Sequence, residues 1–158
     1  MLGLLIVAMG PAAMAWAVSG TGSVGAPAQQ DPANGALADG YNANASGFNA
    51  TAEGISSSAG GLDSTAVGAL SAATGTQSTA LGQGSTASSA DTTVLGYGSA
   101  ATGLLGTATG YGSLAGGDYS VADGSFSQAG FSGAALGDGS VATGISSTAS
   151  GSQSHATG

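Results

Sequence analysis

Glycine recurs at every seventh residue over most of the chain. From Gly40 onward each unit ends on glycine, except that Ser89 takes one slot and the six-residue stretch Ser125–Gly130 shortens one step. The eighteen units begin at residue 34 and share the consensus x-x-S-x-A-x-G. A period held over this length predicts a repeat architecture, in which each unit packs against the next.

Each unit alternates small and variable residues. Positions 3, 5 and 7 are small, whereas positions 4 and 6 vary among Thr, Val, Leu, Ala and Ser. This period of two predicts a strand with one small face and one variable face. Positions 1 and 2 are rich in turn residues and hold every Tyr and Phe, so we expect a five-residue strand followed by a two-residue corner. A coiled coil is excluded, because the heptads have no pair of large apolar residues and a glycine in each heptad would cost a helix about 1 kcal/mol relative to alanine.

Two units form one structural period of fourteen residues. Large apolar residues at position 6 (Val67, Leu81 and Leu95) alternate with polar ones such as Thr74 and Ser88. The sequence therefore predicts an all-β fold, a parallel β-solenoid with two unlike strands per coil. About nine coils stacked at the strand spacing of ~4.8 Å would form a rod about 40 Å long.

The small face is expected to fill the interior of the roll. We assign six alanines to that interior: Ala66, Ala73, Ala80, Ala87, Ala101 and Ala108. The short unit must lose its residue between Ala129 and Phe131, at a strand end or corner. A deletion inside a strand would turn every later side chain to the opposite face.

Composition excludes several classes of function. The chain has eight acidic residues and neither Lys nor Arg, for a net charge of −8, so it lacks the cations that bind nucleic acid, phosphate or anionic lipid. Cysteine is absent. Leu, Ile, Val and Phe number only 25 of 158 residues, too few for a conventional core. A disordered Gly/Ser/Ala spacer is the alternative to a repeat fold.

No pattern of residues supports catalysis or a cofactor. His155 is the only histidine and lies at an outward position of the last unit, so neither a histidine metal cluster nor a well-supported catalytic triad is expected. Asp39 and Glu53 share a row, but calcium-binding β-rolls need Asp in nearly every turn. The stretch Gly20–Gly25 has the letters of a dinucleotide-binding loop without the strand before it or the helix after it. We predict that the chain is not an enzyme and holds no cofactor.

The first residues differ from the repeats. Residues 1–19 join a short apolar run to Ala-rich cleavage-like sites, which is typical of a secretory signal peptide and too short for a membrane span. Residues 20–33 are interpreted as a linker, and 34–158 as the repeat domain.

One outer strand carries a surface stripe that a single solenoid would leave in water. Contiguous apolar surface of this kind marks an interface, and closed rotational symmetry would bury the same stripe in every chain. The predicted interface residues are Thr65, Val67, Thr79, Leu81, Thr93 and Leu95. A row of threonines on a flat solenoid can also order water, so ice binding is an alternative for this face.

The repeats resemble a known family of bacterial surface proteins. STAVGALSAATGTQSTALG (64–82) is similar to the head repeats of trimeric autotransporter adhesins, the YadA-like proteins. The resemblance implies a left-handed parallel β-roll that is exported, forms a homotrimer at the bacterial cell surface or outer membrane, and contributes to virulence. Its partners would be further copies of itself and a ligand of the host matrix, host cells or other bacteria.

Two features depart from that family. Charged residues are scarcer than expected on an adhesive head, which leaves the ligand open. The sequence carries no stalk and no barrel anchor through which it would meet a membrane, so we expect a front fragment of a longer protein. Related repeats could equally form a phage fibre.

Overall fold

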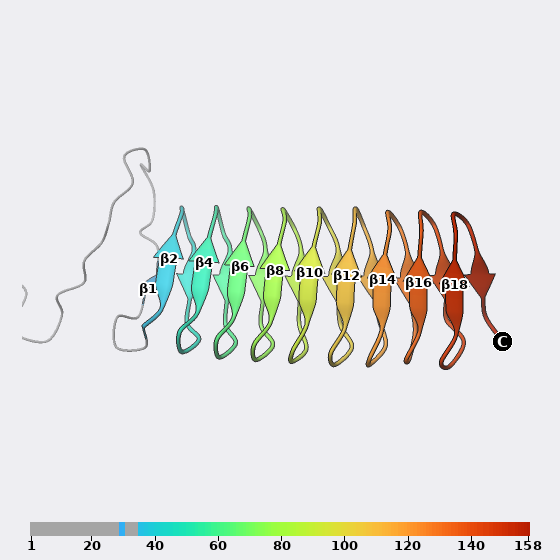
Figure 1. Cartoon of the computed structure of the whole chain (residues 1–158). Coiled ribbons are helices and arrows are strands. Elements are labelled where there is room, and N and C mark those ends of the chain that lie inside the picture. Colours follow the sequence, from blue (N-terminus) through green and yellow to red (C-terminus); the bar gives the residue numbers. More distant parts are fainter. Residues whose placement is uncertain (1–28, 31–34) are drawn as a thin grey trace, which may run out of the picture.

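The chain winds into a flattened parallel β-solenoid (Figure 1). The computed structural model describes residues 29–30 and 35–158. Each strand pairs in parallel with the strand one coil later, as Thr65 does with Thr79, fourteen residues on. The predicted all-β class, parallel pairing and fourteen-residue coil are confirmed.

Two sheets run along the solenoid. One has ten strands of two residues each: β1 (Gln29–Gln30), β3 (Asn44–Ala45), β5 (Ser58–Ala59), β7 (Ala72–Ala73), β9 (Thr86–Ala87), β11 (Ala100–Ala101), β13 (Leu114–Ala115), β15 (Gln128–Ala129), β17 (Val141–Ala142) and β19 (His155–Ala156). The other has nine strands of three residues: β2 (Leu37–Asp39), β4 (Thr51–Glu53), β6 (Thr65–Val67), β8 (Thr79–Leu81), β10 (Thr93–Leu95), β12 (Thr107–Thr109), β14 (Val121–Asp123), β16 (Ala134–Leu136) and β18 (Thr148–Ser150).

The strands are shorter than the five residues expected, because the corners take part of each unit. The N–H of Ser78 donates to the carbonyl of Gly75 three residues earlier, and this bond draws position 3 into the turn. In the ten-stranded sheet the N–H groups of Thr74 and Gly75 both donate to the Ala87 carbonyl, so the chain already bends at position 6. The prediction of five-residue strands was therefore wrong.

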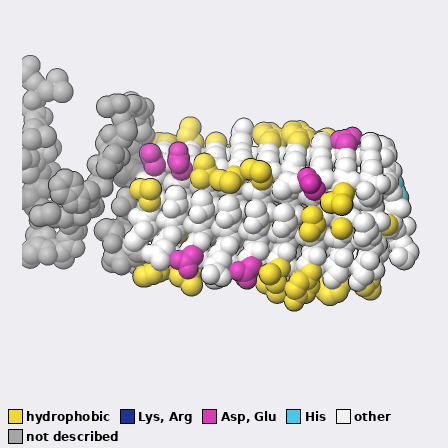
Figure 2. All heavy atoms as spheres, in the orientation of Figure 1, with side chains coloured by type: hydrophobic (Ala, Val, Ile, Leu, Met, Phe, Trp, Pro, Cys, Tyr) yellow, Lys and Arg dark blue, Asp and Glu magenta, His cyan; other side chains and the backbone are white. Residues whose placement is uncertain are grey.

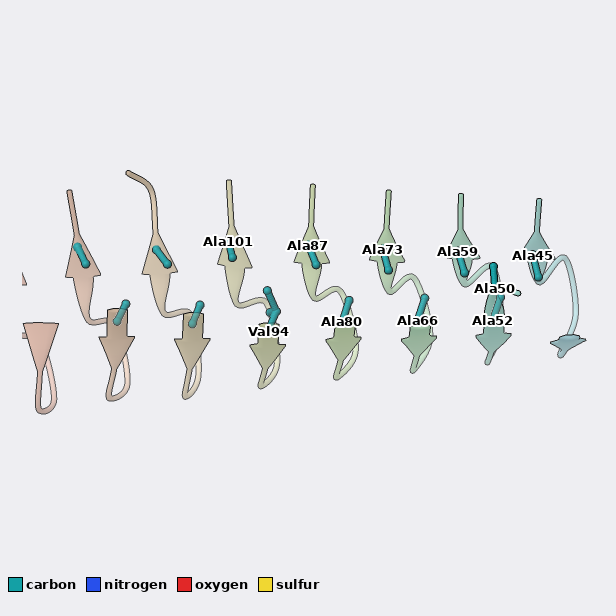
Figure 3. Packing of buried hydrophobic residues seen from close by; sticks show 14 of the residues in the cluster. Ala45, Ala50, Ala52, Ala59, Ala66, Ala73, Ala80, Ala87, Val94 and Ala101 are labelled. Atoms are coloured by element: carbon teal, nitrogen blue, oxygen red, sulfur yellow. The ribbon is translucent and has the colours of Figure 1, made fainter. Parts of the chain in front are cut away.

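Alanine fills the interior between the sheets (Figure 3). Alanines of the ten-stranded sheet point towards those of the nine-stranded sheet, and Val94 is the largest labelled side chain among them. The six alanines assigned to the interior are all fully buried: Ala66, Ala73, Ala80, Ala87, Ala101 and Ala108. Because methyl groups bury little area, the sheets gain stability from their close approach and from the continuous ladder of backbone hydrogen bonds.

A ladder of hydroxyl groups lines the same interior at position 3. The Ser64 hydroxyl donates a 2.7 Å hydrogen bond to the Gly61 carbonyl, and Thr92 makes the equivalent bond of 2.8 Å to Ser89. Within the described ranges no buried side-chain nitrogen or oxygen lacks a partner. The serines therefore close the corners without leaving an unpaired polar group inside.

Every described corner places its second residue in the left-handed region. Thirteen of these residues are not glycine; among them are Leu70 at φ +60°, Tyr119 at +58° and Phe126 at +55°. Glycine, Asn and Asp adopt this conformation readily, whereas residues with larger side chains are strained in it. The corners thus hold several side chains at a conformational cost.

The glycines that end the three-residue strands meet a stricter requirement. Gly82 has φ +134°, and a Cβ atom built there would lie 2.3 Å from the carbonyl oxygen of Gly96 in the next coil. Both the backbone angle and the close stacking of coils exclude a side chain at this point. This explains why the glycine recurs in each coil.

The six-residue unit makes one coil of thirteen residues. Val121 pairs with Ala134, and Gln128 pairs with Val141, each thirteen residues apart. Gly130 alone joins β15 to the turn at Phe131–Ser132, where other coils have two residues. The predicted position of the deletion, between Ala129 and Phe131, is confirmed, and the small residues of later coils still face inward.

The N-terminal predictions lie largely outside the described residues. This applies to the whole of the predicted signal segment, residues 1–19. In the predicted linker, 20–33, only Gln29–Gln30 is described, and it forms β1 beside β3. No helix in the described part of the chain has the length and apolar character to cross a membrane.

Candidate interaction surfaces

The outer face of the nine-stranded sheet carries two side-chain rows, from positions 4 and 6 of every second unit. In the position-6 row Val67 pairs with Leu81, and Leu81 with Leu95. The six residues predicted for the interface lie together on β6, β8 and β10: Thr65, Val67, Thr79, Leu81, Thr93 and Leu95. We call the three position-6 members, Val67, Leu81 and Leu95, the apolar stripe.

The apolar stripe is only partly covered within one chain. Val67 and Leu81 are half-buried between their neighbours, whereas Leu95 is 51% exposed. Exposed Val121 and Leu136 add apolar area further along the same sheet. Burial of this surface against another molecule would be favourable at about 25 cal/mol per Å².

Carboxylates flank the stripe in the position-6 row. Asp39 and Glu53 are direct neighbours before Val67, as expected from the sequence, and Asp123 follows the stripe and accepts a hydrogen bond from the Thr109 hydroxyl. No three His, Cys, Asp or Glu residues gather into a metal-binding group within the ranges that the structure covers. His155 lies exposed on β19.

A row of threonines accompanies the stripe at position 4. Thr65, Thr79, Thr93 and Thr107 occupy consecutive coils in register, and Thr51 extends the row by one coil. The adjacent position-6 residues are the large side chains of the stripe. The side chains of the position-6 row therefore project further from the sheet than the threonines of the position-4 row.

The ten-stranded sheet presents a contrasting outer face. Its position-6 residues are small and exposed, with Thr74, Ser88 and Thr102 in successive coils. This face offers hydroxyl groups and little apolar area over the same length of roll.

Exposed apolar side chains also line the corners, mainly in the C-terminal half (Figure 2). The rings of Tyr97 and Tyr111 stack with centroids 5.3 Å apart and planes inclined by 4°. Phe126 meets Tyr111 edge-on at 5.0 Å. On the corners at the other edge, Tyr119 meets Phe131 edge-on at 6.3 Å.

The repeat matches a family of known adhesin domains. The family model described as YadA head domain repeat (2 copies) matches residues 45–71, 73–99, 101–127, 130–154 and 142–158, which together are more than half of the chain. The chain belongs to the YadA head family. This family is a structural adhesin domain and is not known for enzymatic activity. No curated protein matches the chain.

The YadA-like head has features that the sequence pattern did not reveal. The repeat pattern places the aromatic residues at corners, but it does not show that they contact one another. Tyr97 and Tyr111 are fourteen residues apart and could have been paired from the period alone. Phe126 is fifteen residues from Tyr111 and reaches the same cluster from position 2 of its corner, so the period conceals it.

Proposed function

We propose that this YadA-like head is an exported, trimeric, non-enzymatic adhesive module at the surface of a bacterium. It attaches to host matrix, host cells or other bacteria, and it contributes to virulence. The single observation that carries this proposal is the family match over successive coils of one uninterrupted solenoid. A left-handed roll is part of the same proposal.

The apolar stripe supports the association of three chains. Its in-register Val67, Leu81 and Leu95 leave a continuous apolar row on one sheet, while the opposite sheet bears Thr74 and Ser88 at the equivalent positions. Closed symmetry lets each chain bury the same row. The number three comes from the resemblance to the family.

Attachment tests the adhesive part of the proposal. Beads carrying the full chain would be applied to extracellular matrix proteins, host cells and bacteria, with beads carrying the Ala73→Leu variant as a control for a disrupted roll. We expect the wild-type beads to adhere to at least one of these surfaces and the control beads to be released. Equal retention of both, or retention of neither on any surface, would contradict an adhesive role.

The threonine row favours a second candidate, ice binding. Five threonines in register, from Thr51 to Thr107, form a regular hydroxyl array on one sheet. The array lies on the face that the trimer would cover, so the two candidates exclude each other. Thermal hysteresis of the chain, together with a monomeric mass, would favour ice binding and overturn the trimer.

A further inference from the structure

The corners that follow β10, β12 and β14 bear three exposed rings. We call Tyr97, Tyr111 and Phe126 the aromatic ridge; they are 54%, 51% and 57% exposed. Their corners stack directly, since the Gly112 N–H donates to the Tyr97 carbonyl and the Phe126 N–H to the Tyr111 carbonyl. The ridge is therefore one continuous apolar strip along the edge of the roll.

The corner of Phe126 carries an aromatic residue at a position where the corners on either side carry glycine. Phe126 takes φ +55° at a position where the adjacent corners of the same edge carry glycine, at Gly98, Gly112 and Gly139. A Cβ atom on Gly112 would lie 3.1 Å from two carbon atoms of the Phe126 ring, so the ring occupies the space that this glycine leaves free. The glycine thus lets the Phe126 ring continue the ridge beyond Tyr111.

Carboxylates border the ridge at its C-terminal end. Asp123 ends β14 immediately before the corner of Phe126, and Asp138 lies in the next corner of the same edge, whose Gly139 N–H donates to the Ser125 carbonyl. Both side chains are exposed. The whole chain has no Lys or Arg to neutralise them, so any compensating cation must come from another molecule.

The rings of the aromatic ridge are accessible to such a cation, since more than half of each residue is exposed. Tyr111 stacks on one side of the ring. In the preceding corner the residue in register with Tyr97 is Gln83, whose carbonyl accepts a hydrogen bond from the Gly98 N–H, so Tyr97 is the first ring of the ridge. Guanidinium groups stack favourably on exposed tyrosine faces, and they also pair bidentately with carboxylates.

We propose that the aromatic ridge docks a basic, arginine-bearing segment of a partner protein. One arginine of the partner stacks on the exposed rings of the ridge, and a neighbouring arginine pairs with Asp138 in the next corner. The segment lies along the roll edge, where it contacts successive corners. The rings and Asp138 lie on corners, outside the row of Val67, Leu81 and Leu95, whereas Asp123 stands in that row and is not required for docking.

Calorimetric titration of the full chain with a short peptide of alternating arginine and serine tests the proposal. We expect binding that weakens with salt, because exposed charge pairs are screened. The double variant Tyr97→Ser/Tyr111→Ser should lose about tenfold in affinity through the stacking contact. Asp138→Asn should weaken binding by a smaller factor. Ile145→Ser, at an exposed corner of the other edge, should bind as the wild type does.

Matched peptides define the outcomes that would overturn it. In one, citrulline replaces arginine, which keeps the shape of the side chain and removes the charge. Equal binding of the citrulline peptide would assign the ridge to a neutral apolar partner. Undiminished binding by the double tyrosine variant would assign the affinity to acidic charge alone. Absence of arginine-peptide binding to the wild-type chain would also refute the proposal.

Discussion

The hydroxyl of Ser78 donates a 2.7 Å hydrogen bond to the carbonyl oxygen of Gly75, which also receives the Ser78 N–H at 3.3 Å. One carbonyl thus closes the corner twice, through the backbone and through a buried side chain. The same arrangement recurs at Ser71 with Gly68 and at Ser85 with Gly82. Position 3 therefore contributes to stability by hydrogen bonding as well as by small size.

Removing these hydroxyls should destabilise the roll. Each buried serine replaced by alanine should lower the free energy of unfolding by about 1 kcal/mol, because one side-chain hydrogen bond is lost while the N–H contact remains. The triple variant Ser71→Ala/Ser78→Ala/Ser85→Ala should show a clear fall in urea resistance by circular dichroism. Ser58→Ala, at a half-buried outward position, is the control and should change little.

The interior accepts no large side chain. Ala73→Leu should cost about 3 kcal/mol or more, because the two sheets are too close to accommodate added methyl groups and the stacked coils resist a local shift. Ala72→Leu lies one residue away on the outer face of the same strand, in a row where Leu114 occurs naturally. Thermal melting compares the two variants. A melting temperature for Ala73→Leu equal to that of Ala72→Leu would contradict the interior assignment.

Two neighbouring glycines should differ sharply in their tolerance of alanine. Gly82→Ala combines an angle that side chains do not adopt with a 2.3 Å approach to the next coil, so it should abolish regular stacking there. The added methyl group of Gly84→Ala would lie in open space, and thirteen other corners have a residue larger than glycine at a similar positive φ. This variant should therefore lower the free energy of unfolding by only about 1 kcal/mol. Hydrogen exchange in the flanking coils would locate the damage. Equal protection in both variants would refute this distinction.

Strain at an exposed corner can be relieved. Leu70 is 63% exposed and held at φ +60°, so Leu70→Gly should raise the free energy of unfolding by about 1 kcal/mol, or the melting temperature by about 2–4 °C. Leu62→Gly, at position 1 of the preceding corner along the chain, relieves no positive φ and should instead lower stability. A fall in the melting temperature of Leu70→Gly would show that its side chain contributes more than its strain costs.

The sequence was sufficient for the parts of the fold that a strict period controls. Alternation of small residues fixed which face lies inside, and the resumption of that pattern after Ala129 located the missing residue. The positive φ angles at the corners could not be predicted from residue type. Glycine and Asn at position 2 indicate such an angle, but Leu70, Tyr119 and Phe126 occupy the same position and do not. Strand length was also hidden, since the turn hydrogen bonds that shorten each strand leave no trace in residue type.

The apolar stripe gives the most direct test of assembly. Asp at Val67, Leu81 and Leu95 together should abolish the trimer, because three like charges from each chain would meet close to the shared axis with no Lys or Arg in the chain to compensate. These side chains stand on consecutive strands in register, so the charges would also repel along the row. Sedimentation should then report the mass of one chain.

The matched triple lies on the opposite sheet. Asp at Thr74, Ser88 and Thr102 adds the same charge at the same repeat position, at sites that are exposed in the single chain. This variant should sediment as the wild type does, because water solvates the added carboxylates. Circular dichroism of both triples should match that of the wild type, so that loss of assembly is separated from loss of fold. Any of three results would refute the placement of the interface on the nine-stranded sheet. These are a first triple variant that remains a trimer, a control triple that dissociates as the first one does, and a wild type that sediments as a folded monomer.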